Sequence, residues 1–213
     1  MQALAGFLQK ILWRVFAPFL KFMFRLEVKI ESTNKDFLTN LKKPLIIAAN
    51  HYSWLDPFLI GISFPPNSQV FPIQYGCLYK YYYFPLFLPF LYLLGAFPIK
   101  SKKGGLENSL KRALIILENK GVVGIFPEGA RRRRGRPKKG RRGAAFLAVK
   151  TGAPILPVKI EGALNMSFWE VLLRKRKILI KIGEHFYLPQ KEIKNPEDLN
   201  EDADYIMKTI RSL

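Results

Sequence analysis

Short apolar runs alternate with helix-like segments along most of this chain, and no other feature restricts its possible folds as strongly. The apolar runs predict strands at residues 42–50, 69–76, 96–100, 122–129 (where a turn follows), 153–162 and 177–184. The helical patterns lie at residues 106–121, closed by Gly121, at 141–152, ending near Gly152, and at 196–213, where acidic residues at the start suit the helix dipole. This alternation predicts an α/β protein with a largely parallel sheet flanked by helices.

Charge and composition narrow the classes of function. The 213 residues suffice for one domain with a real core, and 49% hydrophobic content excludes global disorder. The formal net charge of +19 attracts polyanions such as nucleic acid, anionic lipid head groups or an acidic carrier protein. Many aromatic residues lie in apolar runs rather than between the basic residues, which favours a membrane surface over nucleic acid. A single cysteine, Cys77, excludes a disulfide framework and a cysteine-built zinc site, and fits a reducing compartment.

The N-terminal stretch is apolar but is neither a good signal peptide nor a good membrane span, because charges recur through it. On a helical projection its cationic side chains fall within about 60° of one another: Lys10, Arg14, Lys21 and Arg25. A narrow cationic stripe on a broad apolar helix predicts an amphipathic segment that lies in the membrane interface. An ordinary core-packing helix with one solvent-facing side is the alternative.

Residues 78–95 are also strongly apolar, but Pro85 and Pro89 interrupt them. A continuous membrane-spanning helix is therefore not expected there. We interpret this segment as a short, broken, membrane-facing helical region.

Two titratable side chains follow the first predicted strand at the place where α/β sheets bind ligands. His51 lies in the turn, and Asp56-Pro57 resembles a helix N-cap followed by proline at the first helical position. On a regular helix a five-residue spacing separates side chains by about 140°, but the two can converge if His51 lies in the turn and Asp56 is at the first helical position. Asp56 would then fix the tautomer of His51 and leave its other nitrogen as a base. The second histidine, His185, has no such carboxylate and is expected to be a surface residue.

Four sequence blocks, in order, carry a resemblance to a known family. They are NHYSWLD at 50–56, GAFPIK at 95–100, FPEGARR at 126–132 and APILPVKIEG at 153–162. With these blocks, the chain resembles the glycerolipid acyltransferases, the family that includes the 1-acyl-glycerol-3-phosphate acyltransferases. The resemblance covers about residues 25 to 210, and the first and third blocks are its most specific part.

The resemblance implies an O-acyltransferase that moves a fatty acyl group from a thioester to the hydroxyl of a lysophospholipid. An alcohol is a poor nucleophile at neutral pH, so His51 would accept its proton while Asp56 orients the imidazole. No G-x-S-x-G motif is present, so direct transfer is expected rather than an acyl-serine route. We expect Cys77 to be inert. Because the sequence shows no metal-ligand cluster, we expect neither a metal nor a cofactor beyond the acyl-CoA or acyl-carrier protein that serves as co-substrate.

The matching positions for the acceptor and its phosphate are Lys100, Glu128, Gly129 and Arg131. Glu128 would orient donors rather than bind phosphate itself. Two positions depart from the family pattern: Lys100 stands where arginine is usual and loses its bidentate fork, and Ala130 stands where threonine is common. Lysophosphatidic acid, which would give phosphatidic acid, is the acceptor we favour. Another lysolipid or an aminolipid is the alternative.

Residues 131–142 form an arginine-rich run at the rim of the expected site. Its side chains Arg132, Arg133, Arg134 and Arg136 would attract the phosphates of coenzyme A, an acidic acyl-carrier protein or anionic lipid. A merely solvated loop is one alternative. The segment GRPKKG also resembles an AT-hook, so a nucleic-acid-binding arm is a second alternative from a different class, and the one we favour least.

These observations predict a membrane-associated acyltransferase in phospholipid synthesis, peripheral or monotopic on the cytoplasmic face. Residues 1–26 would be its membrane-association segment and residues 27–213 its acyltransferase domain. Its partners would be membrane lipids, the lysophospholipid acceptor and the acyl donor. The sequence gives no indication of an oligomeric state.

Overall fold

The computed structural model describes residues 15, 28–32, 38, 41–65, 68–78, 91, 95–99, 105–131, 139–164 and 177–213. Several predictions concern positions outside these residues, and they remain predictions: the cationic stripe of Lys10, Arg14, Lys21 and Arg25, most of the broken segment 78–95, Lys100, and the arginines Arg132, Arg133, Arg134 and Arg136.

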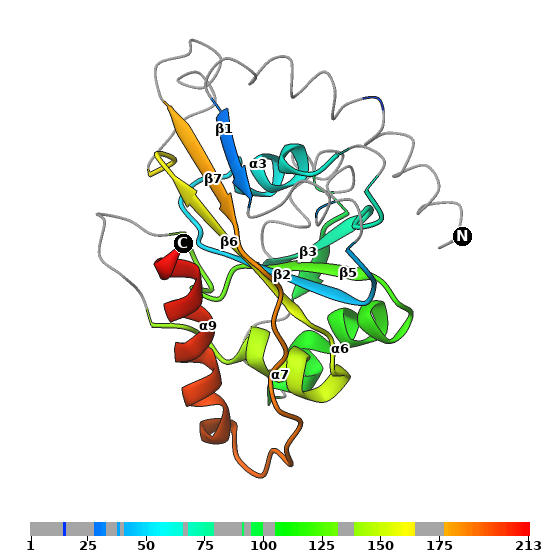
Figure 1. Cartoon of the computed structure of the whole chain (residues 1–213). Helices are drawn as coiled ribbons and strands as arrows, with labels where there is room; N and C mark the ends of the chain where they lie inside the picture. Colours follow the sequence, from blue (N-terminus) through cyan, green and yellow to red (C-terminus); the bar gives the residue numbers. More distant parts are fainter. Residues whose placement is uncertain are drawn as a thin grey trace.

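The described part of the chain contains a seven-stranded sheet (Figure 1). Its strands are β1 (Val28–Ser32), β2 (Leu45–Ala49), β3 (Ile73–Leu78), β4 (Phe97–Ile99), β5 (Val122–Ile125), β6 (Ile155–Glu161) and β7 (Ile178–Ile182). Their order is β1-β7-β6-β2-β5-β3-β4, and every neighbouring pair is parallel except β6 with β7. The prediction of an α/β fold with a largely parallel sheet is confirmed.

Strand β1 was not predicted. It lies at one edge of the sheet, parallel to β7, and its side chains are only partly buried. An edge strand needs no apolar run, because backbone pairing on one side is enough to hold it. The sequence therefore carried little signal for this strand.

Helices cover both faces of the sheet (Figure 1). They are α3 (Asp56–Ser63), α6 (Gly105–Glu118), α7 (Gly143–Thr151) and α9 (Asn200–Ser212), with a 3-10 turn η1 (Pro196–Leu199) before α9. Buried side chains of α3 belong to one hydrophobic cluster, and those of α6, α7 and α9 belong to another. No helix in the described ranges combines the length and apolar composition needed to cross a membrane.

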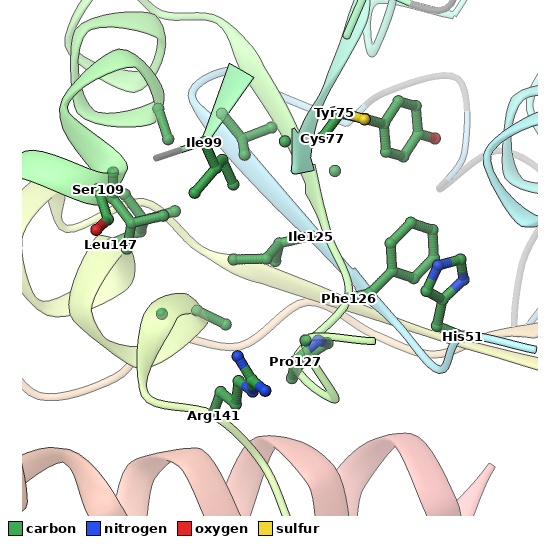
Figure 2. Close-up of a pocket in the computed structure, with 18 of the residues that line it drawn as sticks. His51, Tyr75, Cys77, Ile99, Ser109, Ile125, Phe126, Pro127, Arg141 and Leu147 are labelled. Carbon is green, nitrogen blue, oxygen red and sulfur yellow. The ribbon is translucent and has the colours of Figure 1, made fainter. Parts of the chain in front are cut away.

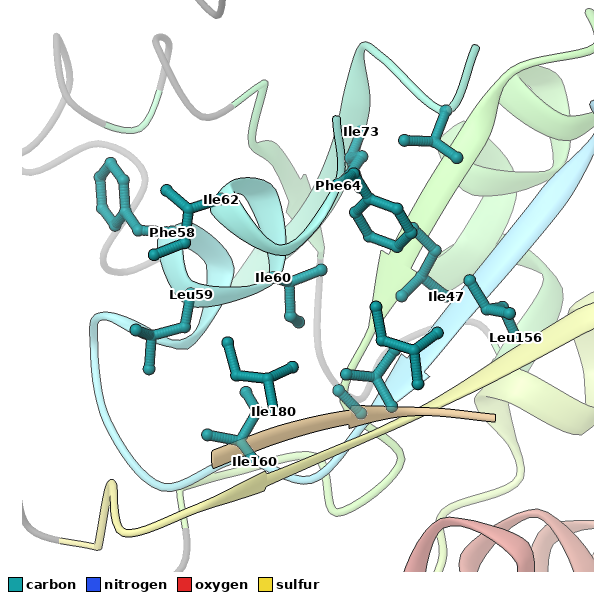
Figure 3. Close-up of a cluster of buried hydrophobic side chains, with 14 of the residues drawn as sticks. Ile47, Phe58, Leu59, Ile60, Ile62, Phe64, Ile73, Leu156, Ile160 and Ile180 are labelled. Carbon is teal, nitrogen blue, oxygen red and sulfur yellow. The ribbon is translucent and has the colours of Figure 1, made fainter. Parts of the chain in front are cut away.

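Strand β2 separates the two hydrophobic clusters. Leu45, Ile47 and Ala49 pack into the cluster under α3, whereas Ile46 and Ala48 pack into the cluster under α6, α7 and α9. All five residues are buried, which explains why this strand reads as a continuous apolar run rather than an alternating one. Figure 3 shows the first cluster, where Leu59 and Ile60 of α3 face Ile160 and Ile180 of the sheet.

The helix ends match the sequence predictions in one case and differ in another. Helix α7 ends at Thr151, next to Gly152 as expected, and Gly152 is its C-cap with a left-handed φ of 65°. Helix α6 ends at Glu118, and the left-handed residue after it is Lys120 with φ 55° rather than Gly121. Gly121 is needed for a different reason: a Cβ there would lie 2.6 Å from the carbonyl oxygen of Ile116.

Candidate active site

The strand register brings two distant motifs together. β5 and β6 both pair with β2 in parallel, so the carboxyl ends of all three strands lie at one edge of the sheet. Ala48 stands opposite Ile125, so the chain leaves β2 at Asn50 and His51 beside the point where it leaves β5 at Phe126. Ligands bind at this edge in open α/β sheets.

Asn50 fixes the end of β2. Its side-chain amide is buried, donates from Nδ2 to the carbonyl oxygen of Ile160 at 2.8 Å, and accepts at Oδ1 from the backbone N–H of Ile160 at 2.7 Å. The side chain thereby continues the hydrogen-bond ladder to β6 beyond the last residue of β2. His51, the next residue, starts from a rigid backbone position.

His51 and Asp56 meet at the start of helix α3. Asp56 Oδ2 lies 2.7 Å from His51 Nδ1. The helix begins at Asp56 itself, with Leu55 as N-cap and Pro57 in its first turn. Asp56 is therefore not the N-cap that its sequence resembles, but it occupies the first helical position, from which it was expected to converge with His51. Its carboxylate turns back toward the preceding turn instead of capping the N–H groups that follow.

The preceding turn surrounds the Asp56 carboxylate with donors. Oδ2 accepts the backbone N–H groups of Tyr52 at 2.6 Å and Ser53 at 2.8 Å, and Oδ1 accepts the hydroxyl of Ser53 at 3.1 Å. The carboxylate is fully buried, and a buried anion needs such hydrogen bonds. A carboxylate only accepts, so His51 Nδ1 carries the proton and Nε2 holds the lone pair that can act as a base.

Aromatic rings support the imidazole. Phe126 stacks on His51 with ring centroids 4.1 Å apart and planes at 16°, and Tyr75 lies beyond it at 6.1 Å (Figure 2). Burial, and to a smaller degree the Asp56 carboxylate, raises the pKa of Tyr75 far above its usual range. Tyr75 therefore stays a neutral phenol and adds no charge beside His51.

The FPEG turn, residues 126–129, follows β5 and contacts the turn that carries His51. Glu128 is buried, and its Oε1 lies 3.4 Å from the backbone nitrogen of His51. The turn closes through the backbone N–H of Gly129, which donates to the carbonyl of Phe126 at 2.9 Å. Gly129 has φ 66°, a left-handed conformation that favours glycine. Glu128 thus connects the two motifs.

Three described arginines lie near the FPEG turn in the pocket wall, and each makes different contacts. The guanidinium of Arg131 lies over the Trp54 ring at 4.6 Å. Arg142 Nε donates to Asn200 Oδ1 at 2.7 Å, and its Nη2 lies 3.1 Å from Glu197 Oε1, so it joins the start of α7 to the C-terminal region. Arg141 donates its backbone N–H to the carbonyl of Pro127 at 2.6 Å.

A large pocket opens beside these groups. It has a volume of about 1020 Å³, with His51, Arg131 and Arg141 among its lining residues. Most of its wall is apolar and comes from β3, β4, β5, α6 and α7, including Phe97, Ile99, Leu110, Ala113, Ile125 and Leu147. Figure 2 shows His51 and Arg141 bordering the same space as Ile99, Ile125 and Leu147. The pocket combines a long apolar wall with cationic groups and a base.

Cys77 also lines this pocket, where burial raises the pKa of its thiol. A protonated thiol is a poor nucleophile. Replacing Cys77 by alanine is therefore expected to leave catalytic activity within about twofold of wild type. Steady-state rates of the purified variant test this, and inactivation with an intact fold would instead indicate that Cys77 carries an acyl group.

The structure places the described candidate residues around one site. His51, Asp56, Glu128, Gly129 and Arg131 lie together at the carboxyl edge of the sheet. His185 lies elsewhere and is exposed, as predicted.

Sequence reasoning missed several contributors to the site: Phe126, Tyr75, Trp54, Arg141 and the apolar wall. Phe126 and Trp54 stood inside the recognised motifs, so their position was a usable signal. Arg141 was one of many basic residues in the run 131–142, and nothing in the sequence distinguished it.

Comparison with known proteins finds acyltransferases, both by family and by individual relatives. The model of a protein family described as Acyltransferase matches residues 29–161. A Bacillus subtilis protein named 1-acyl-sn-glycerol-3-phosphate acyltransferase is 28% identical over 187 residues, which cover 85% of this chain and 88% of that protein. A Saccharomyces cerevisiae protein of the same name is 33% identical over 165 residues, 74% of this chain but 50% of the yeast protein.

The fold also matches a solved structure. The crystal structure of the 1-acyl-sn-glycerophosphate (LPA) acyltransferase PlsC from Thermotoga maritima superposes with a TM-score of 0.65 at 20% identity. The match covers 100% of this chain and 82% of that chain. At this identity the likeness establishes the fold alone.

Proposed function

The chain belongs to the Acyltransferase family, and on that premise we propose that it is a 1-acyl-sn-glycerol-3-phosphate O-acyltransferase. It transfers a fatty acyl group from an acyl thioester to the free hydroxyl of lysophosphatidic acid, and the product is phosphatidic acid. The names of the bacterial and yeast relatives support this acceptor. The observation that carries the proposal is the His51–Asp56 pair at 2.7 Å, whose His51 lies in the wall of a largely apolar pocket bordered by arginines.

The reaction needs one base and one acid, and His51 serves as both. Nε2 accepts the proton of the acceptor hydroxyl as its oxygen attacks the thioester carbonyl. The tetrahedral intermediate then collapses, the carbon–sulfur bond breaks, and the imidazolium returns the proton to the leaving thiolate. The buried Asp56 carboxylate stabilises the imidazolium formed in between and holds the ring in its productive tautomer.

The remaining groups divide between the two substrates. The apolar wall of the pocket suits a fatty acyl chain. Each Å² of apolar surface that the chain removes from water there stabilises binding by about 25 cal/mol. Arg131 binds the acceptor phosphate, and its stacking on Trp54 limits the directions in which the guanidinium can point. Gly129 shapes the turn that carries it, Glu128 orients the backbone between the motifs, and Lys100 adds a second cation.

The direct test is product analysis with purified protein in detergent or vesicles. Acyl-CoA and acyl-carrier protein are each offered with lysophosphatidic acid, and phosphatidic acid is measured by mass spectrometry. We expect phosphatidic acid from at least one donor. If a panel of other lysolipids and aminolipids gives product while lysophosphatidic acid does not, the acceptor assignment is wrong and the family assignment stands.

We further propose that residues 1–26 attach the enzyme to the cytoplasmic face of the membrane, on the basis of the cationic stripe in their sequence. Deletion of residues 1–25 is expected to release much of the protein from anionic vesicles while the domain stays folded. Flotation at several salt concentrations measures this, because other basic residues retain some salt-sensitive affinity. Undiminished vesicle binding after the deletion would refute the anchor.

The arginines Arg132, Arg133, Arg134 and Arg136 are proposed to attract the anionic donor or lipid. The alternative of a nucleic-acid-binding arm makes a separate prediction. DNA binding that survives replacement of His51, in a protein without acyltransferase activity, would favour that alternative.

A further inference from the structure

Arg141 is exposed to solvent, but both its backbone and its side chain contact the FPEG turn. Its backbone N–H donates to Pro127, and its side chain crosses Gly129. A Cβ on Gly129 would overlap Cδ and Nε of Arg141 and would lie 2.8 Å from its Cζ. The absence of a side chain at Gly129 therefore makes room for the guanidinium group itself, and not only for the aliphatic stem.

The guanidinium of Arg141 borders the pocket without an acidic partner in the described part of the chain. No carboxylate there lies within ion-pair distance of it. Its neighbour Arg142 pairs with Glu197, and the nearby Glu128 directs Oε1 to the backbone of His51. Arg141 thus presents its positive charge to the same pocket that His51 lines (Figure 2). Arg131 lines this pocket as well.

We propose that Arg141 is a further phosphate-binding residue of the acceptor site, in addition to Arg131 and Lys100. It binds the phosphate monoester of the lysophospholipid together with Arg131, from the other segment that frames the FPEG turn. A guanidinium presents paired N–H donors to phosphate oxygens, so two arginines can share one dianion. This inference rests on the proposed function, because it takes lysophosphatidic acid as the acceptor.

The first experiment separates the acceptor phosphate from the phosphates of the donor. Arg141→Gln is expected to raise KM for lysophosphatidic acid by about 10- to 100-fold, the usual range for a lost charge-assisted hydrogen bond. KM for acyl-CoA and kcat stay near wild type, and the preference for lysophosphatidic acid over unphosphorylated monoacylglycerol falls by a similar factor. Arg141→Lys restores part of the affinity, because lysine restores the positive charge but not the paired N–H donors of a guanidinium.

Arg112→Gln is the matched control. Arg112 is exposed on α6 and does not line the pocket, so this variant loses the same charge without losing a pocket contact. If KM for lysophosphatidic acid rises equally in both variants, the effect comes from the net charge of the protein, and the proposal is overturned. A rise in KM for acyl-CoA alone would assign Arg141 to the donor and overturn it as well.

A binding measurement keeps the inference testable if turnover fails. The probe is 1-acyl-2-deoxyglycerol 3-phosphate, which has the phosphate but lacks the reacting hydroxyl, titrated calorimetrically in detergent. We expect Arg141→Gln to raise the Kd of this probe by about 10- to 100-fold and Arg112→Gln to leave the Kd unchanged. Wild type that binds the probe but does not acylate lysophosphatidic acid would refute the proposed function and leave the phosphate site standing. A Kd that Arg141→Gln does not change, or no binding by wild type, overturns the phosphate site.

Discussion

Replacing His51 by alanine is expected to lower kcat for acyl transfer by about 10²- to 10⁴-fold, the usual contribution of a general base. The variant retains the apolar pocket and the arginines, so KM for both substrates should change much less than kcat. The fold should also persist, because Asn50 still fixes the end of β2 and the Asp56 carboxylate keeps its hydrogen bonds to Tyr52 and Ser53. Steady-state kinetics with thermal unfolding as a control measure both effects.

His185 provides the matched control for this variant. It is the other histidine of the chain, is exposed, and lies outside the pocket. His185→Ala should therefore keep wild-type kinetics. Substantial activity in a folded His51→Ala variant would show that another group deprotonates the acceptor, and the assignment of the base would have to be abandoned.

Asp56→Asn is expected to give the second largest effect, a loss of about 10²- to 10⁴-fold in kcat. Asparagine has nearly the same shape: its oxygen can accept from the same backbone N–H groups, and its amide can donate to the Ser53 hydroxyl. The variant thus keeps much of the local geometry but loses the negative charge that stabilises the imidazolium. A decrease of about 1–3 kcal/mol in the free energy of unfolding should accompany the kinetic loss.

Stability and catalysis must be separated for this variant. Asp202 is a mostly buried aspartate on α9, paired with Lys191 at 2.7 Å and outside the pocket. Asp202→Asn should lower stability without lowering kcat in the folded protein. If Asp56→Asn lowers only the unfolding temperature and turns over normally below it, the carboxylate is structural and the proposed pair is wrong.

The local parts of the fold could be predicted from the sequence because their causes are local. The apolar run of β2 and the end of α7 beside Gly152 depend on neighbouring residues, and both were predicted correctly. The edge strand β1 and the left-handed Lys120 after α6 were not predicted, because backbone pairing and helix closure can use residues without a strong preference.

By itself, the sequence determined the α/β class and the two motifs with their candidate residues, because residue type and spacing are encoded along the chain. Only the tertiary structure decided that Phe126 stacks on His51, that Glu128 reaches the His51 backbone, and that Arg141 crosses Gly129. The third contact depends on the chain returning to the FPEG turn just before α7. The first two contacts depend on the parallel register of β2 and β5, which brings segments more than 70 residues apart to one edge of the sheet. Such a register follows from packing on both faces of the sheet, and no local pattern specifies it.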